Sequence, residues 1–309
     1  MKVLAVSGGS KDGSNDSMAK EALMGAKEQG AEVEFIRLLD LDLKPCTGCI
    51  ACVNSLMTGG SGKCIIKDDF NWLDEKVLDV DALLFAVPIF EKGAPAVFKL
   101  IQDRLCGPSH DTGINIVAGK IAEEAGRSGP DPRKLKRKAV SYISIGASNW
   151  TSRAAADMAL TAMTSMWKVV DNTVFSWSKS IIMEDEKVAE CHRIGADLAK
   201  AAADIENAQY LGETGICSNC YSRNFLIHKD GSAECEVCGI KGKLSFENGT
   251  SRFDFPEGEL EHAHTLLPGK FKHMDDIRRV ETKLVENKKT DEFKARVKKY
   301  KEFIQASRP

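Results

Sequence analysis

The sequence predicts an α/β protein: a doubly wound, parallel five-stranded sheet, then a small four-cysteine metal-ribbon module and a helical tail. Short apolar runs alternate with helical patterns over residues 1–209, as in strands joined by crossover helices. Two Cys-x-x-Cys pairs follow within residues 210–274. Residues 275–309 combine apolar positions at helical spacing with dense Lys and Glu, which indicates an amphipathic helical pair.

The composition of the chain narrows the classes of protein to which it can belong. The chain has 309 residues, of which 43% are hydrophobic, and a net charge of -2 at pH 7, so it is long enough for two cores. It has no apolar run near the roughly 18 residues of a membrane span, and its first residues do not form a signal peptide. We therefore expect a cytoplasmic protein without membrane contact. Its ten cysteines then indicate metal or redox chemistry rather than disulfides.

The first strand, over residues 3–6, leads into a loop of small and hydroxyl residues, 7–17, with the sequence SGGSKDGSNDS. A helical pattern begins near Met18 and ends at Gly30, and a second strand follows over residues 33–36. Such a loop places backbone N–H groups at the positive end of a helix, where phosphate binds. It matches neither the dinucleotide nor the P-loop fingerprint, so it indicates either a mononucleotide phosphate site or a plain connecting turn.

Four cysteines come next, at Cys46, Cys49, Cys52 and Cys64. Three thiols at three-residue spacing can face one centre, and a distant fourth can close the shell, as in a [4Fe-4S] cluster. The alternative is that they are small buried side chains without a metal.

The remaining β-α units follow in order. We expect strands over residues 81–87, 139–145 and 173–176, and helices over residues 70–80, 96–104, 114–125, 152–170 and 184–207. Loops 88–95 and 146–150 follow the third and fourth strands, and in a parallel sheet such loops meet the first loop at one edge.

Taken together, these segments resemble the flavodoxin-like NADPH-dependent FMN reductases, and among them the iron-sulfur flavoproteins. The resemblance rests on the Ser/Gly/Asn loop, Pro-Cys-Thr-Gly-Cys at 45–49, Cys-Ile-Ile-Lys-Asp-Asp at 64–69, Val-Pro-Ile-Phe at 87–90 and a helix that ends in Asp-Arg at 103–104. It spans about residues 1–209 and implies FMN, with its phosphate in the first loop and its ring against the later loops.

Carried over by position, the resemblance implies three groups of FMN-binding residues. The phosphate group is Ser10, Lys11, Ser14, Asn15 and Ser17. The first ring-contact group is Pro88, Ile89, Phe90, Glu91, Lys92 and Gly93. The second ring-contact group is Gly146, Ala147 and Ser148. Asp16 lies among the phosphate residues, so we expect its carboxylate to point away from the phosphate.

The C-terminal cysteines are Cys217, Cys220, Cys235 and Cys238, two knuckles with fourteen residues between them. Four thiolates at this spacing are typical of a tetrahedral metal site that stabilises a small module. The module resembles a zinc ribbon, and also rubredoxin-like modules that hold iron. We favour zinc and keep iron as the alternative.

These features predict an FMN-dependent oxidoreductase in which the flavin carries the chemistry, so no catalytic side chain is assigned. The electron donor would be NAD(P)H or a reduced carrier protein such as ferredoxin, and the acceptor a flavin, quinone, nitro compound or other small molecule. The alternative is a flavin-binding regulatory or docking protein whose ribbon recognises a protein or nucleic acid. Residues 210–309 carry 18 Lys/Arg and 16 Asp/Glu, which argues against nucleic acid. The apolar stripe of the tail must be buried on the body of the protein or on a partner subunit, and we expect a homo-oligomer.

Overall fold

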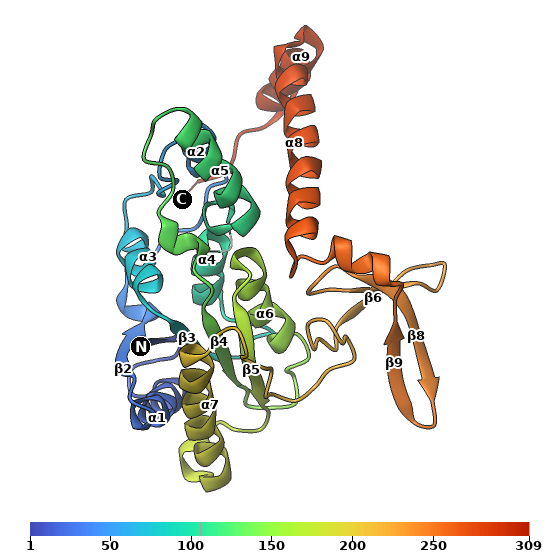
Figure 1. The fold of residues 1–309 in the computed structure, drawn as a ribbon. Helices are drawn as coiled ribbons and strands as arrows, with labels where there is room; N and C mark the ends of the chain where they lie inside the picture. The colour runs from blue at the N-terminus through green and yellow to red at the C-terminus, as the bar shows by residue number, and fades with distance from the viewer. Residues whose placement is uncertain (106, 309) are drawn as a thin grey trace.

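The computed structural model describes residues 1–105 and 107–308 (Figure 1). A parallel five-stranded sheet has the order β2-β1-β3-β4-β5, which confirms the predicted doubly wound fold. Its strands are β1 (Lys2–Ser7), β2 (Glu32–Arg37), β3 (Ala82–Pro88), β4 (Ala139–Ile145) and β5 (Lys168–Phe175). The strand order reverses between β1 and β3, so the crevice where such sheets bind ligands lies at the carboxyl ends of these two strands.

Helices cover both faces of the sheet. The helices of this part are α1 (Ser14–Glu28), α2 (Ala51–Met57), α3 (Phe70–Asp79), α4 (Ala96–Leu105), α5 (Thr112–Glu124), α6 (Ala154–Ser165) and α7 (Asp185–Ala203). Short 3-10 turns are η1 (Leu38–Asp40), η2 (Pro108–His110), η3 (Pro132–Leu135) and η4 (Ile181–Met183). The apolar faces of α1 and α7 share one core with the sheet, and those of α3, α4 and α6 share the other.

The two helices α1 and α7 approach one another closely because each has a glycine at the crossing. A Cβ atom on Gly195 would lie 1.7 Å from the carbonyl oxygen of Ala22, and one on Gly25 would lie 2.1 Å from that of His192. Any larger residue would push the two helices apart. These glycines therefore set the distance between α1 and α7.

One predicted boundary was wrong. The helix expected over residues 152–170 ends at Ser165, and β5 begins at Lys168 instead of residue 173. Met166 adopts a left-handed conformation with φ of 51°, which stops the helix. Lys168 then pairs with Ala139 of β4. The Ala- and Met-rich sequence carries no Gly or Pro to signal this stop.

The second sheet is antiparallel and four-stranded, in the order β6-β7-β8-β9. Its strands are β6 (Phe225–Ile227), β7 (Ala233–Cys235), β8 (Lys241–Glu247) and β9 (Thr250–Asp254), and a 3-10 turn η5 (Glu257–His262) follows. Side chains of this module, including Val237, Ile240 and Phe253, belong to the same apolar cluster as α3, α4 and α6. The module therefore shares a core with the large sheet.

The chain ends in α8 (Leu267–Lys289) and α9 (Asp291–Phe303). These helices project from the body, with α9 farthest from the metal module (Figure 1). Helix α8 begins at Leu267, before residue 275, where we placed the start of the tail. Across the described residues, none of the helices is both long enough and apolar enough to span a bilayer.

Candidate functional site: a flavin edge and a four-cysteine centre

The loop between β1 and α1 is shaped by two glycines. A Cβ atom on Gly9 would lie 2.6 Å from the Cβ of Asn15, and one on Gly13 would lie 2.7 Å from Ser10 Oγ. Glycine thus lets the backbone close tightly over the start of α1, whose first N–H groups have no partner within the helix. This cradle fits an anionic ligand such as the phosphate of FMN.

Asp16 is buried and its carboxylate is fully engaged by the protein. Ser7 Oγ donates to Oδ1 at 2.6 Å, and the backbone N–H of Asp12 donates to Oδ2 at 3.0 Å. Arg37 Nη2 lies 2.6 Å from the same Oδ2. The negative charge is therefore paired with Arg37 on β2, so the carboxylate braces the loop without opposing a phosphate.

The five predicted phosphate residues lie in different settings. Ser10 and Lys11 are exposed, Asn15 is buried, and Ser14 and Ser17 are half-buried. Ser14 Oγ donates to the carbonyl oxygen of Lys179 at 3.0 Å. Their contacts with FMN stay a prediction.

The loop after β3 contains a tight turn. The backbone groups of Phe90 and Gly93 exchange two hydrogen bonds, 3.1 and 3.0 Å long. The central residues, Glu91 and Lys92, both have positive φ, as a type I′ turn requires. A side chain at residue 93 would displace the Asp157 carboxylate, because a Cβ there would lie 2.1 Å from Asp157 Oδ2. The turn leaves Phe90 exposed to 64%.

Backbone hydrogen bonds tie the loops after β3, β4 and β5 together. Ile89 N–H donates to the carbonyl of Ile145, and Gly146 N–H donates to that of Phe175. Ser178 N–H donates back to Gly146. Gly146 is buried, Ala147 is exposed, and Pro88 and Ser148 are half-buried. The structure thus brings both predicted ring-contact groups to the edge of the large sheet where its strands end. We call this edge, formed by the loops after β1, β3, β4 and β5, the flavin edge.

The loop after β5, which was not predicted from the sequence, contributes Trp177 and Lys179 to this edge. The side chain of Trp177 is exposed to 68%. Its backbone N–H donates to the carbonyl oxygen of Ser148 at 3.4 Å. The rule that placed the other loops, that parallel strands end at a common edge, would also have found this one.

Cys46, Cys49, Cys52 and Cys64 are spread over the segment before α3. Cys46 and Cys49 are exposed, whereas Cys52 and Cys64 are half-buried. A hydrogen bond from the backbone of Ala51 lowers the pKa of Cys49. Within the described chain these four sulfurs are not among the groups that lie within 4.8 Å of one another. A [4Fe-4S] cluster at these residues stays a prediction.

Arg104 holds Cys64 and Asp68 together, a contact that was not predicted from the sequence. Its Nη2 donates to Cys64 Sγ at 3.2 Å and to Asp68 Oδ1 at 3.0 Å, and its guanidinium lies 3.9 Å from the centre of the Phe70 ring. Burial opposes ionisation of Asp68, but Arg104 and two backbone N–H groups outweigh it and lower the pKa of Asp68. This buried ion pair fixes Cys64 against the body.

The other four cysteines do converge. Sγ atoms of Cys217, Cys220, Cys235 and Cys238 all lie within 4.8 Å of one another. The Cys217–Cys238 sulfurs are 3.7 Å apart and the Cys220–Cys235 sulfurs 3.5 Å apart. Four thiolates around zinc have sulfur–sulfur distances of about 3.8 Å, given Zn–S bonds of roughly 2.3 Å. The donor set therefore fits a tetrahedral metal ion.

The two cysteine knuckles have the same backbone form. Tyr221 N–H donates to the carbonyl of Cys217, and Gly239 N–H donates to that of Cys235, at 2.8 and 2.9 Å. Both residues have positive φ, which is costly for tyrosine but free for glycine. The Tyr221 ring stacks on Tyr210 at 4.3 Å, so it anchors the metal module to the segment that follows α7.

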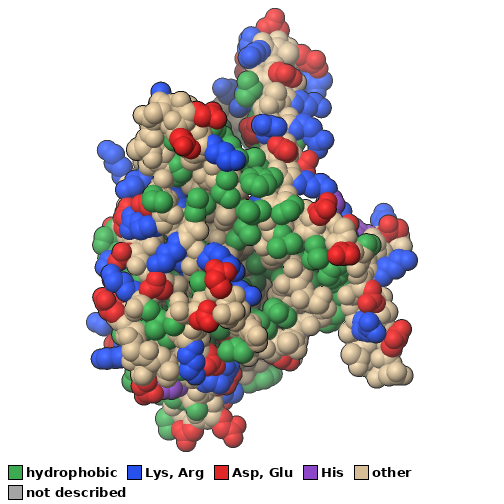
Figure 2. Space-filling view, in the orientation of Figure 1, with side chains coloured by type: hydrophobic (Ala, Val, Ile, Leu, Met, Phe, Trp, Pro, Cys, Tyr) green, Lys and Arg blue, Asp and Glu red, His purple; other side chains and the backbone are tan. Residues whose placement is uncertain are grey.

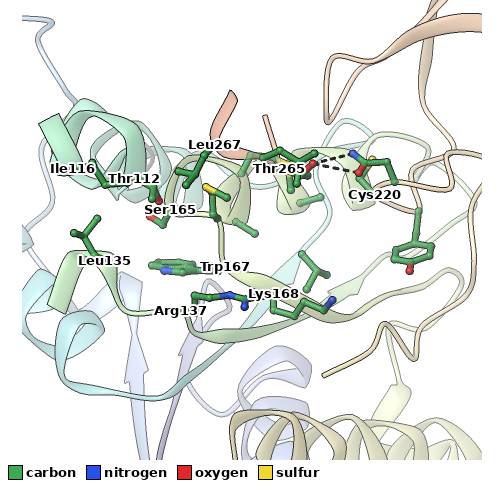
Figure 3. Close-up of a pocket in the computed structure, with 18 residues that line it drawn as sticks. Thr112, Ile116, Leu135, Arg137, Ser165, Trp167, Lys168, Cys220, Thr265 and Leu267 are labelled. Carbon is green, nitrogen blue, oxygen red and sulfur yellow. Dashed lines mark hydrogen bonds between the residues drawn. The ribbon is translucent and has the colours of Figure 1, made fainter. Parts of the chain in front are cut away.

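A cavity of about 570 Å³ lies between α5, α6, the start of β5 and the metal module. Figure 3 shows Trp167 and Leu267 on opposite sides of it, with Arg137 and Lys168 below and Cys220 at one end. A second cavity of about 270 Å³ shares Cys220 and Tyr221 with it and runs along β5. The loop after β1 lines neither of these two cavities.

Comparison with known proteins gives the same assignment. Residues 1–180 match the NADPH-dependent FMN reductase family. A solved structure of a flavone reductase is 48% identical, with a TM-score of 0.90 and full coverage of both chains. A flavone synthase from Aspergillus candidus is 25% identical over 292 residues, which cover 90% of this chain and 88% of that protein.

An iron-sulfur flavoprotein from Methanocaldococcus jannaschii is 34% identical over 135 residues. The match covers 42% of this chain and 65% of the relative, just under two thirds of its length. More than half of the present chain, including the loops after β1, β3 and β4, lies within the family match. The chain therefore belongs to the NADPH-dependent FMN reductase family and is a flavin-dependent oxidoreductase.

Proposed function

We propose that this protein uses NAD(P)H and FMN to reduce the conjugated carbon–carbon double bond of a planar aromatic enone of the flavone type. The observation that carries the proposal is the similarity to a flavone reductase over the full length of both chains, at 48% identity. A second relative, which covers most of the chain, is a flavone synthase. Forming and reducing a flavone double bond are opposite directions of one redox step.

The exposed aromatic side chains at the flavin edge support a planar acceptor. Phe90 and Trp150 are exposed to 64% and 59% on the loops after β3 and β4. Lys92 Nζ lies 5.2 Å from the centre of the Trp150 ring. Flat apolar rings stack on such side chains, and the ammonium group suits an acceptor that carries phenolate or carbonyl oxygens.

FMN, when bound, would supply hydride transfer from NAD(P)H to the acceptor. The enone carbon farther from the carbonyl gains the hydride, and the neighbouring carbon gains a proton from solvent. One NAD(P)H is oxidised for each double bond reduced. In this scheme the protein binds the phosphate in the β1–α1 loop and holds the acceptor plane with Phe90 and Trp150.

Zinc in the four-cysteine centre fits this function as a structural ion. Three of its ligands, Cys217, Cys235 and Cys238, are fully buried, and the cluster lies in a core shared with the sheet. A closed Cys₄ shell leaves no position for substrate.

The test is anaerobic turnover of the FMN-loaded protein with flavone and either NADPH or NADH. We expect a product heavier than flavone by two hydrogens and equimolar oxidation of the nicotinamide. Trp150→Ala should raise KM for flavone several-fold without loss of bound FMN, whereas Trp72→Ala, an exposed tryptophan on α3, should leave KM unchanged. Oxidation of NAD(P)H without any reduced flavone would overturn the acceptor assignment.

A further inference from the structure

The cavity of about 570 Å³ beside α6 is too large to be a packing defect. Well-packed interiors contain few voids larger than a water molecule, whereas small-molecule sites enclose roughly 300–1,000 Å³. Its walls come from α5, α6, the start of β5, the metal module and the start of α8. Pockets where two structural units meet are frequent ligand sites. The cavity therefore has the size and the position of a binding site for a small molecule.

Most of the side chains that line the cavity are apolar. The large ones include Ile116, Met163, Trp167, Leu266 and Leu267. Figure 2 shows hydrophobic side chains gathered around a hollow between the body and the start of α8. Figure 3 shows Trp167 and Leu267 on opposite sides of the cavity. Trp167 is only 5% exposed, so packing against the body fixes its ring, and a flat aromatic group can stack on such a ring.

The charged side chains that line the cavity are both cationic. They are Arg137 and Lys168, and the described residues of the lining include no Asp or Glu. Arg137 Nη1 lies 2.6 Å from Glu206 Oε2, in an exposed ion pair. Lys168 is half-buried and makes no ion pair with any residue that the structure describes. Its ammonium group is therefore left to pair with a negative charge inside the cavity.

This part of the cavity lies at the end of the sheet opposite to the flavin edge. Lys168 is the first residue of β5 and pairs with Ala139, the first residue of β4. The loops of the flavin edge follow the last residues of the strands. Because β5 has eight residues, the two ends of this strand are roughly 25 Å apart. A small molecule beside Lys168 would not reach a flavin ring at the other end.

We propose that this cavity binds a flat aromatic molecule that carries one negative charge, a carboxylate or a phenolate. The aromatic ring lies between Trp167 and Leu267, and the charged group pairs with the ammonium of Lys168. A hydrogen bond between two charged groups is stronger than one between neutral groups, and apolar walls strengthen it further. Cys220 of the metal module lines the same cavity, so the bound molecule bridges the module and the sheet.

The first test is calorimetric titration of the full-length, FMN-loaded protein with 2-naphthoate and with 2-naphthamide, its neutral counterpart of similar shape. We expect one naphthoate per chain with a Kd of roughly 0.1 mM, as is reasonable for a ligand of about a dozen heavy atoms. The amide should bind about tenfold more weakly, because it cannot pair with Lys168. Equal affinities for the two, or no binding of naphthoate at about 5 mM, would overturn the proposal.

Lysine variants test the charge. Lys168→Met keeps an apolar stem and should weaken naphthoate binding about tenfold. Lys243→Met, at an exposed position of β8 outside the cavity, should leave the Kd unchanged. Lys92→Met reports on the flavin edge, where Lys92 lies beside Trp150, and should also leave it unchanged. Weaker binding in Lys92→Met with unchanged binding in Lys168→Met would place the ligand at the flavin edge and overturn the proposal.

A larger side chain inside the cavity tests its position. Leu267→Trp places a second indole opposite Trp167 and should abolish naphthoate binding, whereas Leu226→Trp, at an exposed position of β6 outside the cavity, should not. Bound FMN and the unfolding temperature without naphthoate check that both variants are folded. Unchanged affinity in a folded Leu267→Trp protein would contradict the site. None of these readouts uses flavone turnover, so they are independent of the proposed function.

Discussion

Arg104 joins three parts of the protein through one guanidinium. It pairs with Asp68 before α3, donates to the sulfur of Cys64, and lies against the Phe70 ring. The side chains of Arg104 and Asp68 are 2% and 0% exposed. Removing one partner of such a pair leaves the other as a buried, unpaired charge, which costs more than the pair contributes.

We predict that Arg104→Met lowers the free energy of unfolding by about 3–5 kcal/mol, because Asp68 is left uncompensated. Urea denaturation measures this directly. Adding Asp68→Asn to the same chain removes the stranded charge and should recover part of the loss. A double variant as unstable as Arg104→Met alone would show that the ion pair is not the cause.

His192 gives the α1–α7 layer a dependence on pH. Its Nδ1 and Nε2 lie 2.8 and 3.0 Å from carboxylate oxygens of Glu21 and Glu28. Hydrogen bonds to Glu21 and then Glu28 raise the pKa of His192 above its ordinary value. The folded state thus binds this proton more tightly than the unfolded state, and the contribution to stability is present below the ordinary pKa and lost as pH rises through the folded one.

We therefore predict that wild type is more stable than His192→Gln at about pH 5.5, and that the difference shrinks toward about pH 8.5. Urea midpoints of the two proteins across this range provide the measurement. A difference that stays constant with pH would mean that the ion pairs contribute nothing.

At the scale of elements, the layer of α1 and α7 depends on glycine rather than on apolar volume. We predict that Gly195→Ala destabilises the protein by about 3 kcal/mol or more, because its Cβ would meet the backbone of Ala22. Gly119→Ala on α5 is the matched control, since nothing lies within 4 Å of its Cβ position. That change should be neutral or stabilising by up to about 1 kcal/mol. Thermal unfolding of both variants measures these changes in stability. Similar losses of stability in the two variants would contradict the close crossing of α1 and α7.

At the same scale, the four cysteines of the metal module form a group that could hold one metal ion. We predict about one zinc ion per chain by elemental analysis and its loss in Cys235→Ser, with a lower unfolding temperature, because metal binding is coupled to folding of such modules. Cys191→Ala, which removes a buried cysteine outside the centre, should keep the metal. Wild-type protein that holds no metal at these cysteines, or Cys235→Ser protein that keeps all of it, would contradict a metal site at the four cysteines.

At the scale of the whole molecule, the sequence predicted what local patterns encode. The apolar runs of β1, β3 and β4 and the two cysteine knuckles follow fixed local rules, so the sheet and the four-cysteine site were found. Contacts between residues far apart in the sequence were not predicted, because no spacing pattern shows that such residues are close. Examples are the contacts of Arg104 with Cys64, of Arg37 with Asp16, and of Tyr210 with Tyr221. The end of α6 was missed because a left-handed Met166, rather than glycine, stops it.

The central claim is that FMN binds at the β1–α1 loop, and its most direct test is FMN binding by wild type and Gly9→Ala. A Cβ at residue 9 would lie 2.6 Å from that of Asn15 and would force the cradle open. We expect one FMN per chain in wild type, released on denaturation and identified by mass spectrometry. Gly9→Ala should bind FMN about tenfold or more weakly, whereas Gly119→Ala should bind it as wild type does. A folded wild type that binds no FMN, or a Gly9→Ala variant with unchanged affinity, would contradict the account.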